Sequence, residues 1–423
     1  MASKAFLSKY FSVLQIFLGL LCISDAGRVI LDKFYDVERY NAVSDGNDAG
    51  GVILDKFFDV RRFGAVSDGK TDNFHAFHKA WRKACNCDGK CWVSVPRGTY
   101  KLGPVVFVGP CKGITGFLIQ GVVVAPTDPA QFTDHWIIFR YVDQLLIRGG
   151  GTLDGQGASA WPLNDCRTNP HCKPLPATMR FDFITNSRIH HLKSVNSKNA
   201  HINFFACKNI TINKVKLIAP ADSPNTDGIR LGASSNIKIS RSIIATGDDC
   251  IAMIDGTNNV VISYVSCGPG HGISIGSIGK VLNEQVHDIK VLNCNISGTQ
   301  NGLRVKTWAP SLSGMVTNLT FQDILMNQVS NPIIFDQNYC PDPPCNDKAQ
   351  SLVQISNVTF KNIIGTSSSK TAVNFICSRA QPCDKVTLDN INLTYNGFGG
   401  PSVSSCKNVE GNSIGTQMPP DCL

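Results

Sequence analysis

The chain has 423 residues, a formal net charge of +8, 43% hydrophobic residues and 17% charged residues. This composition excludes an intrinsically disordered chain, which is poor in apolar residues, and a collagen-like chain, in which glycine recurs at every third position. Because the length exceeds the ~100–200 residues of a usual domain, the chain forms either two domains or one elongated repeat. The periodicity of the sequence has to decide between them.

Residues 1–26 have the features of a secretory signal peptide. Lys4 and Lys9 precede an apolar run from Phe11 to Ile23, and small residues follow that run. The run is too short to span a bilayer comfortably, and no later stretch approaches ~20 uninterrupted apolar residues. We therefore expect an exported, soluble protein without a membrane anchor.

A tandem duplication follows this leader. The sequence VILDKFYDV of residues 29–37 returns as VILDKFFDV in residues 52–60. The two copies cannot occupy the same place in one fold, so we expect residues 27–50 to form a weakly ordered extension. Residues 51–423 are predicted to form the folded domain.

Only the second copy continues into a helical pattern. Aromatic and small apolar residues recur at helical spacing from Asn73 to Cys85, and Thr71 or Asp72 is available as the N-cap. This segment is predicted to form a short helix at the N-terminal end of the domain.

The cysteines indicate an oxidising compartment. Once Cys22 is removed with the leader, an even number remains, which suits disulfide bonding. Four pairs lie close together in the sequence: Cys166 and Cys172, Cys340 and Cys345, Cys377 and Cys383, and Cys406 and Cys422. Cys85, Cys87 and Cys91 are spaced like a metal site but have no neighbouring histidine, so disulfides are the favoured interpretation and no metal is expected.

Five Asn-x-Ser/Thr sequons make the chain a candidate glycoprotein on the secretory route. They begin at Asn209, Asn295, Asn318, Asn357 and Asn392. The sequence alone does not indicate which of them are accessible.

From about residue 115 onward, one short phrase recurs along the chain, in which a β-branched run follows an asparagine, aspartate or lysine. The copies begin at Asn209, Asn236, Asn259, Asp288, Asn318, Asn357 and Lys385. Spacings of roughly 20 to 40 residues, with turn-forming residues between short strands, are typical of a solenoid whose coils add strands to stacked parallel sheets. The predicted fold is therefore all-β: a single right-handed parallel β-helix with a short N-terminal capping helix.

A β-sandwich or β-barrel is the competing fold. It also contains many short strands, but hairpin dipeptides and clean alternation, rather than one repeated phrase, would mark it. In a β-helix, neighbouring coils lie ~4.8 Å apart, so residues one repeat apart become neighbours in space.

Polar residues occur at coil-length intervals in the middle of the domain. The set consists of Asn225, Asp227, Asp248, Asp249, His271, Arg304 and Lys306. Asp248 follows Asp227 by 21 residues, and His271 follows Asp249 by 22 residues. If each interval is one coil, three carboxylates, an imidazole and two cations line one face of the solenoid.

Asp248 and Asp249 are adjacent and would point to opposite sides of a regular strand. Both reach one face only if the backbone is irregular, which the preceding Gly247 permits. Carboxylates held this close repel one another, so one is expected to have a raised pKa and act as an acid while its neighbours stay ionised as bases. Glycoside hydrolysis requires this division of labour.

Four motifs stand in a fixed order in this region: Asn225-Thr226-Asp227, Gly247-Asp248-Asp249, Gly270-His271-Gly272 and Arg304-Val305-Lys306. In order and spacing they resemble the signature motifs of polygalacturonases, the family 28 glycoside hydrolases. The resemblance extends from about Val52 to Cys422, and it is closest to the pollen-type, exo-acting plant branch. It implies that the chain cleaves the α-1,4-galacturonosyl linkages of pectin or polygalacturonate with inversion.

The resemblance also implies the catalytic roles. Asp248 would donate a proton to the glycosidic oxygen, and Asp227 and Asp249 would activate water on the opposite face. His271 would support the protonation of the acid and contact the substrate.

For substrate binding, the resemblance points to Arg304 and Lys306 as partners of the galacturonate carboxylate, Arg304 as a planar fork and Lys306 as a point charge. Asn225 and Tyr339 would complete the sugar-binding set. No cofactor is implied.

The sequence departs from the family pattern at three positions. Arg230 stands where a histidine is common, and Ala252 and Ile254 replace a small polar residue and a glycine. No catalytic group is lost, but the detail of the sugar subsites is altered.

The positive net charge suits an acidic partner, which the resemblance makes an acidic polysaccharide. Nucleic acid is not expected, because the sequence has no basic helix and no Lys/Arg run with interleaved aromatic residues. We expect a monomer that is secreted to the cell wall.

Two other classes of protein stay as alternatives. A calcium-dependent pectate lyase also uses a β-helix with aspartate clusters, but the adjacent Asp248 and Asp249 with the downstream His271 argue against it. A catalytically inactive pectin-binding wall protein is opposed by the retained carboxylates and histidine.

Exo action is favoured over endo action, because the phrases around the motifs are most similar to the exo-acting branch. Exo action requires one closed end of the groove, and in a β-helix loops must close it. The long inserts Pro162–Pro176 and Pro341–Ala349 are the candidates, since a cysteine pair could stiffen each of them. Cys166 and Cys172 lie within the first insert, and Cys345 of the second pairs in sequence with Cys340 directly before it.

Overall fold

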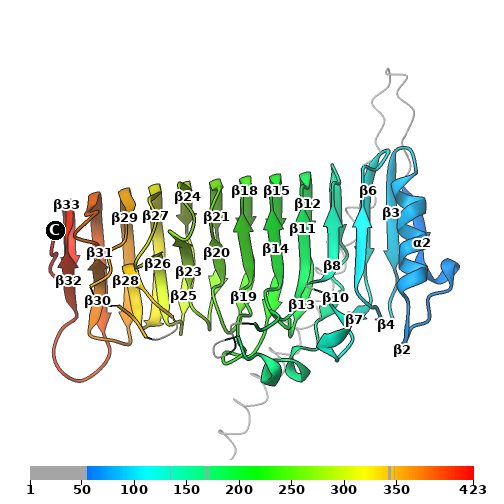
Figure 1. Ribbon diagram of the computed structural model, residues 1–423, viewed down its shortest axis with the longest axis horizontal. Helices are drawn as coiled ribbons and strands as arrows, with labels where there is room; N and C mark the ends of the chain where they lie inside the picture. Colours follow the sequence, from blue (N-terminus) through cyan, green and yellow to red (C-terminus); the bar gives the residue numbers. More distant parts are fainter. Residues whose placement is uncertain (1–54, 134, 167–168, 170, 342–343, 347) are drawn as a thin grey trace, which may run out of the picture. The chain divides into compact units, whose positions relative to one another are not determined.

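A computed structural model describes residues 55–423, apart from residues 134, 167, 168, 170, 342, 343 and 347. Strands stack in chain order through this region, from β1 (Lys56–Asp59) to β33 (Val409–Met418) (Figure 1). Strands of neighbouring coils pair in parallel, as β14, β17, β20 and β23 do. The predicted right-handed parallel β-helix is therefore confirmed, and a sandwich of antiparallel sheets is excluded.

The described strands form two sheets. The smaller sheet has eleven strands: β5 (Val105–Val108), β8 (His135–Arg140), β11 (Ala177–Asp182), β14 (Ile202–Phe205), β17 (Ile229–Gly232), β20 (Ile251–Met253), β23 (Ile273–Ile278), β26 (Asn301–Trp308), β28 (Asn331–Tyr339), β30 (Thr371–Ile376) and β32 (Val403–Lys407). This sheet carries the residues of the candidate site.

The larger sheet contains two rows of strands, and β27 pairs with both rows. One row contains β1, β3 (Lys90–Val95), β6 (Ile114–Ile119), β9 (Leu145–Arg148), β12 (Thr185–His190), β15 (Lys208–Asn213), β18 (Ser235–Ser240), β21 (Thr257–Ser263), β24 (Glu284–Leu292), β27 (Gly314–Val329), β29 (Val353–Ser367), β31 (Cys383–Tyr395) and β33. The other contains β2 (Asp68–Asp72), β4 (Thr99–Lys101), β7 (Val122–Val124), β10 (Thr152–Asp154), β13 (Lys193–Val195), β16 (Lys216–Ile218), β19 (Ile243–Ala245), β22 (Ser266–Cys267) and β25 (Asn295–Ser297).

The core consists of apolar columns that run from coil to coil. One column follows the strand register through Ile189, Ile212, Ile239, Ile262, Val291, Phe321, Phe360 and Leu388, all of which are buried. Parallel pairing puts equivalent residues of successive coils directly beside one another, so each β-branched run of the repeated phrase adds one layer to the column.

The predicted N-terminal helix is present as α2 (Phe74–Cys85), next to the first coils (Figure 1). It buries Phe77, Ala80 and Trp81, and the Trp81 ring lies 5.2 Å from that of Phe107 in the first strand of the smaller sheet. The helix therefore covers the open end of the core. The N-cap is Asn73 and not the predicted Thr71 or Asp72, although the side chain of Asp72 accepts the N–H of Phe74.

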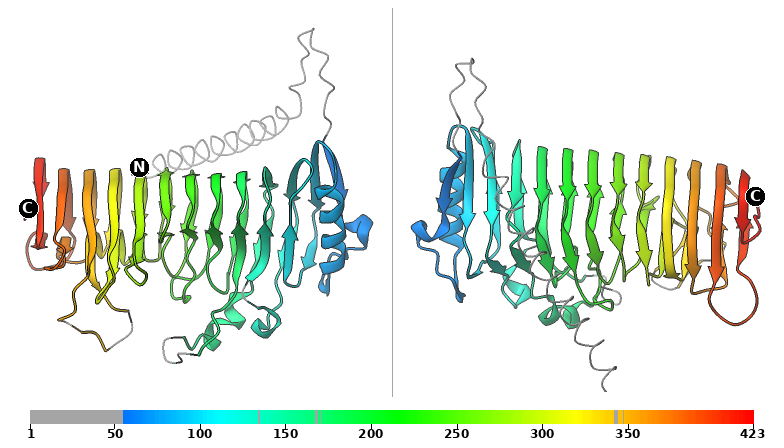
Figure 2. Two further views of the ribbon diagram at one scale, coloured as in Figure 1. Left: turned by 45° about the horizontal axis from the view of Figure 1, so that its top comes forward. Right: turned by 180° about the vertical axis from the view of Figure 1, so that it is seen from behind.

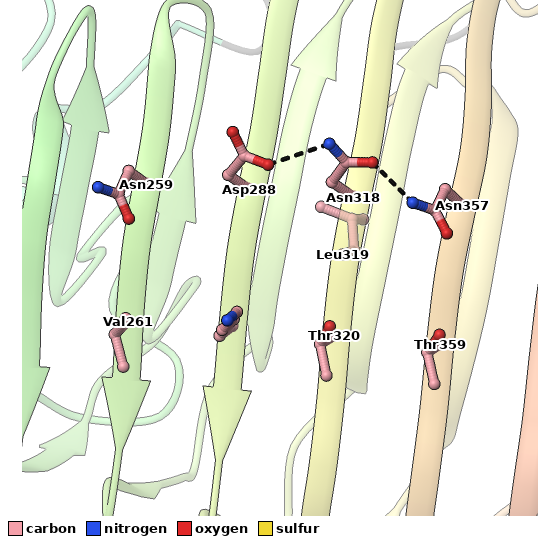
Figure 3. A pocket seen from close by; sticks show the side chains of 9 residues that line it. Asn259, Val261, Asp288, Asn318, Leu319, Thr320, Asn357 and Thr359 are labelled. Carbon is pink, nitrogen blue, oxygen red and sulfur yellow. Dashed lines mark hydrogen bonds between the residues drawn. The ribbon is translucent and has the colours of Figure 1, made fainter.

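The residue that opens each repeated phrase has a left-handed backbone, with φ between 49° and 59° for the seven copies. Asparagine and aspartate tolerate this conformation better than most residues. The side chains also form ladders, as Figure 3 shows for Asp288, Asn318 and Asn357, in which each amide donates to the preceding coil. The repeated phrase thus marks a turn with positive φ, at which asparagine or aspartate stands in six of the seven copies.

The ladders have a common direction. Along the first, Asn186, Asn209, Asn236 and Asn259 each donate to the side chain one coil before, and the series starts at Asp143. A second ladder starts at Asp288 and a third at Asp323. An aspartate fits the first position because it accepts a hydrogen bond without having to donate one.

Replacing Asn236 by alanine should destabilise the fold, because the variant loses a hydrogen bond on each side and keeps an unfavourable positive φ. We expect a loss of about 1–3 kcal/mol in the free energy of unfolding, measured by denaturant titration. Asn236→Gly is the matched control, since glycine removes the hydrogen bonds but accepts φ = 58°. Equal stability of the alanine variant and the wild type would contradict a role for the ladder.

The sequons divide between two environments. Asn209, Asn318 and Asn357 belong to the ladders, whereas Asn295 and Asn392 are exposed strand residues outside them. Glycosylation of any of the five stays a prediction.

Seven disulfides form in the described region: Cys85–Cys111, Cys87–Cys91, Cys166–Cys172, Cys250–Cys267, Cys340–Cys345, Cys377–Cys383 and Cys406–Cys422. They include the four pairs that lie close in sequence. Cys85, Cys87 and Cys91 are also disulfide-bonded, as the sequence favoured. The even count did not mean complete pairing, however, because Cys207 and Cys294 are free and buried. Both fill core positions, where cysteine behaves as a small apolar residue.

The predicted signal peptide of residues 1–26 and the duplicated extension of residues 27–50 lie outside the described residues. Among the residues that are described, no helix has the length and apolarity to cross a membrane.

Candidate active site

A cleft of about 340 Å³ lies over the middle coils, along β17, β20, β26 and β28 of the smaller sheet. Six of the eight residues predicted from the sequence line it: Asn225, Asp227, Asp248, Asp249, Lys306 and Tyr339. The other two, His271 and Arg304, contact the carboxylates of Asp248 and Asp249. The structure therefore brings all eight together.

Asp227 lies in the turn that leads into β17. Thr226 fixes this turn, because its hydroxyl hydrogen-bonds that of Ser223 at 2.7 Å and accepts the N–H of Gly247, one coil later, at 2.9 Å. The side chain of Asp227 is only 4% exposed, and its Oδ2 accepts two hydrogen bonds from Arg230.

The backbone bends at Gly247 and Asp248, which lets Asp248 and Asp249 line the same cleft. The irregular backbone predicted for this pair is confirmed. Gly247 is needed because a Cβ atom there would lie 2.0 Å from the carbonyl oxygen of Ser223. Asp248 then folds back, and its Oδ1 accepts the N–H of Asp249 at 2.8 Å.

Asp249 is a buried carboxylate with three donors. Its Oδ1 accepts the hydroxyl of Ser274 at 2.7 Å and Nη2 of Arg304 at 3.2 Å, and its Oδ2 accepts Nζ of Lys306 at 2.8 Å. Arg304 and Lys306 are alternate residues of β26 and share one face, as predicted. Both cations therefore have a partner within the chain, and their side chains are 10% and 9% exposed.

His271 stands one coil after Asp248. Its backbone N–H donates to the carbonyl of Asp248, and its Nδ1 lies 2.9 Å from Asp248 Oδ1. The hydrogen bond to Asp248 raises the pKa of His271, so the imidazole holds its proton more strongly than in water. The two side chains form a pair that shares one proton.

The pKa values of Asp227 and Asp248 shift in opposite directions. Burial raises the pKa of Asp227 to about 6, although the positive charge of Arg230 opposes the shift. Burial also pushes the pKa of Asp248 upward, but the hydrogen bond and charge of His271 outweigh it, and the net shift is downward. One carboxyl thus has a raised pKa, as predicted, but it is Asp227 and not Asp248, the residue to which the resemblance assigns the acid role.

Tyr339 ends β28 and forms one wall of the cleft. Its ring lies 5.3 Å from Nζ of Lys306 and 5.8 Å from Cζ of Arg304, and the ring of Trp308 meets it edge-on at 5.1 Å. Burial raises the pKa of the Tyr339 hydroxyl, so this group stays neutral near pH 7. The position fits a side chain that packs against a sugar.

The sequence reasoning missed Ser274 and did not nominate Arg230 as a site residue. Ser274 is in register with Arg304, one coil before it. Its polar side chain stands between Ile273 and Ile275, and this break in an apolar run is the signal that could have found it. Arg230 was recognised only as a departure from the family pattern, yet it bonds directly to Asp227.

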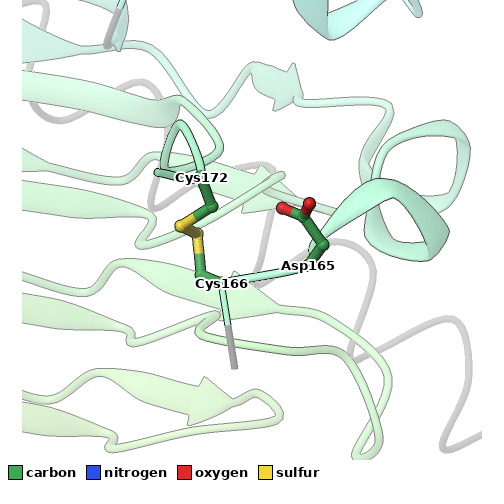
Figure 4. A group of neighbouring side chains, drawn as sticks. All are labelled: Asp165, Cys166 and Cys172. Carbon is green, nitrogen blue, oxygen red and sulfur yellow. A yellow bond between two sulfur atoms is a disulfide. The ribbon is translucent and has the colours of Figure 1, made fainter. Parts of the chain in front are cut away.

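Two groups of side chains have the spacing of metal ligands. Asp248, Asp249 and His271 have ligand atoms within 4.8 Å of one another, but Arg304 and Lys306 already neutralise Asp249. In the other group, Asp165 lies beside two sulfur atoms that are bonded to each other, so neither offers a thiolate (Figure 4).

Comparison with known proteins identifies the family. The sequence profile of "Glycosyl hydrolases family 28" matches residues 85–416. The chain belongs to this family. An exopolygalacturonase of Platanus acerifolia is 48% identical to this family 28 chain. The match covers 82% of this chain and 93% of the relative. A polygalacturonase of Gossypium barbadense is 47% identical over 96% and 95% of the two chains.

Solved structures agree with the family 28 fold. An endo-xylogalacturonan hydrolase from Aspergillus tubingensis superposes with a TM-score of 0.75 at 21% identity, covering 86% of this chain and 99% of the other. An exopolygalacturonase from Thermotoga maritima gives a TM-score of 0.67 at 19% identity over 85% and 92% of the two chains. At these identities the likeness concerns the fold alone.

The three departures from the family 28 pattern gather in one place. Arg230, Ala252 and Ile254 all line the cleft beside Asp227. Ile254 packs over Gly232, where a Cβ atom would come within 3.2 Å of its side chain. One wall of the cleft is therefore changed, while the carboxylates themselves are kept.

Proposed function

We propose that this family 28 hydrolase cleaves the α-1,4-galacturonosyl linkages of pectin or polygalacturonate with inversion, from the end of the polysaccharide chain. The observation that carries the proposal is the cleft itself, which combines three carboxylates, an imidazole and two cations on one face of the β-helix. The relatives named exopolygalacturonase or polygalacturonase support the substrate. An acidic sugar also suits a cleft that contains Arg304 and Lys306.

In this mechanism Asp248 gives a proton to the glycosidic oxygen while a water molecule attacks the anomeric carbon from the opposite face. Asp227 accepts a proton from that water, and its Oδ1 is available because Arg230 uses only Oδ2. The glycosidic bond breaks, and the leaving sugar departs with a new hydroxyl group. Asp227 and Asp248 come from successive coils and both line the cleft. Inversion requires the acid and the base to act from opposite sides of the scissile bond.

The pKa of Asp248 is lowered, whereas an acid must hold a proton before it reacts. Nδ1 of His271 lies 2.9 Å from Asp248 Oδ1, and the raised pKa of His271 favours a protonated imidazole that can pass its proton to the carboxylate. A bound sugar displaces water from the cleft, and the loss of water favours the neutral carboxylic acid. Asp248 then delivers to the glycosidic oxygen the proton that the pair shares.

Loops beside the cleft support exo action. The insert that follows β10 contains the short helical turns η4 (Gly157–Ser159) and η5 (Trp161–Leu163), and just after them Nδ2 of Asn164 donates to Oδ1 of Asn225 at 3.0 Å. This contact holds the insert against Asn225, two residues before Asp227. The disulfide Cys166–Cys172 stiffens the same insert (Figure 4).

The second candidate insert, Pro341–Ala349, begins two residues after Tyr339, and the disulfide Cys340–Cys345 ties its first residues to the residue before it. In Figure 2, both inserts extend from the same side of the stacked coils. The cleft therefore lies between two loops, and the one at Asn164 is the proposed barrier that stops a polymer from passing through.

Product analysis on polygalacturonate tests the proposal. We expect mainly monomeric galacturonate, released with a slow fall in viscosity, in the presence of a calcium chelator and without unsaturated products. A rapid viscosity drop with mixed oligomers would instead indicate endo action. Calcium-dependent release of unsaturated sugars would indicate a pectate lyase, and binding without turnover would indicate an inactive wall protein.

The place of action follows from the substrate. Pectin lies in the plant cell wall, so we propose that the protein is secreted to it and acts there as a monomer on an acidic polysaccharide. The predicted leader of residues 1–26 supports export.

A further inference from the structure

Arg230 is the cation of the cleft that the proposed mechanism does not yet use. It lies in β17, and its Nε and Nη2 donate to Oδ2 of Asp227 at 3.1 and 2.9 Å. Both bonds come from one edge of the planar guanidinium and end on one oxygen of a nearly buried carboxylate. A fork of this kind fixes the orientation of the carboxylate as well as neutralising it.

The side chain of Arg230 is more accessible than the other cations of the site. It is 38% exposed, whereas those of Arg304 and Lys306, which both bond to Asp249, are 10% and 9% exposed. Nη1 of Arg230 takes no part in the bonds to Asp227 and remains as a donor. The residue can therefore hold Asp227 and meet an anion in the cleft at the same time.

The strand register places Arg230 on the opposite side of the acidic centre from Arg304. The column runs from Arg230 through Ala252 and Ser274 to Arg304, which is three coil steps or roughly 14 Å at the usual strand spacing. The guanidinium of Arg230 bonds to Asp227 and that of Arg304 to Asp249, so the two cations stand at carboxylates of successive coils. Ala252, the neighbour of Arg230, has a small side chain that leaves room for the guanidinium.

We propose that Arg230 positions the carboxylate of Asp227 and also binds the carboxylate of a second galacturonate unit. The inference rests on the function proposed above and deepens it. Arg304 and Lys306 recognise an acidic sugar on one side of the scissile bond, and Arg230 recognises one on the other side, next to the insert that contacts Asn225. The substrate class is thus a galacturonan with two neighbouring free carboxylates.

Two variants separate the two roles. Arg230→Gln removes the charge and the fork, and it should raise KM for polygalacturonate roughly tenfold and lower kcat roughly tenfold. Arg230→Lys keeps the charge without the fork, so it should recover most of the KM while kcat stays low. With highly methylesterified pectin, Arg230→Gln should change KM much less, because that substrate has few free carboxylates.

Arg188→Gln is the matched control, since Arg188 is an exposed arginine in β12 of the larger sheet. Unchanged kcat and KM in a folded Arg230→Gln variant would overturn the proposal, and a KM for Arg230→Lys as high as that of Arg230→Gln would overturn the carboxylate contact. If Arg230→Gln does not fold, Arg230→Lys alone tests the proposal. A wild-type kcat in the Arg230→Lys variant would exclude the positioning role. Wild-type protein that releases no galacturonate would refute the proposed function instead, before any variant is compared.

Discussion

Asp248→Asn should lower kcat on polygalacturonate by at least ~10²-fold, because an amide cannot give a proton to the glycosidic oxygen. The fold should survive, since Asn keeps the carbonyl oxygen that accepts the N–H of Asp249. The sharper measurement uses an aryl galacturonide whose leaving group needs no proton. On that substrate the same variant should retain most of its kcat.

Asp227→Asn is the matched control for this experiment. A residue that activates water is needed whatever the leaving group, so this variant should be slow on both substrates. The raised pKa of Asp227 makes the opposite assignment a real alternative. If Asp227→Asn, rather than Asp248→Asn, recovers its kcat on the aryl substrate, then Asp227 is the acid and Asp248 activates water.

Lys306→Met should affect both stability and turnover. Lys306 donates to Asp249 at 2.8 Å, and the side chains of both residues are almost entirely buried. The carboxylate of Asp249 loses one of its three donors but keeps Arg304 and Ser274, so the loss in the free energy of unfolding should be about 1.5–3 kcal/mol, the range for a hydrogen bond to a charged group. Binding of galacturonate oligomers should weaken as well, because the cleft loses a cation that lines it.

The double variant Lys306→Met with Asp249→Asn tests the remaining partner of the carboxylate. It leaves the buried Arg304 without the charge of Asp249, so the free energy of unfolding should fall below that of the single variant while activity stays low. Thermal unfolding and oligomer binding of the single and double variants are the measurements. A single variant with wild-type stability and KM would contradict the buried pair between Lys306 and Asp249.

Much of the fold was predictable because the repeated phrase follows from a backbone requirement. Each coil turns at a residue with positive φ, and few residue types accept that conformation, so Asn236 and Asn259 reveal the period directly. The catalytic set was predictable for a related reason. Asp227 and Asp248 stand one coil apart in sequence, and stacking converts that interval into proximity.

Other features depend on packing between coils, which no local pattern specifies. The raised pKa of Asp227 comes from burial under neighbouring coils, so the sequence predicted that one carboxyl would differ but not which one. The bond between Arg230 and Asp227 depends on which way a long side chain turns. Cys207 and Cys294 stay free because they lie within the core, a position that a count of cysteines does not reveal.

The one-way direction of the asparagine ladders limits how such a chain can grow. An extra coil copied from the one that carries Asn236 would insert an amide that both donates and accepts, so the series would continue without interruption. A coil copied from the one that carries Asp288 would set two carboxylates side by side with no donor between them. Lengthening of the solenoid by gene duplication is therefore expected to succeed within a ladder and to fail at its first residue.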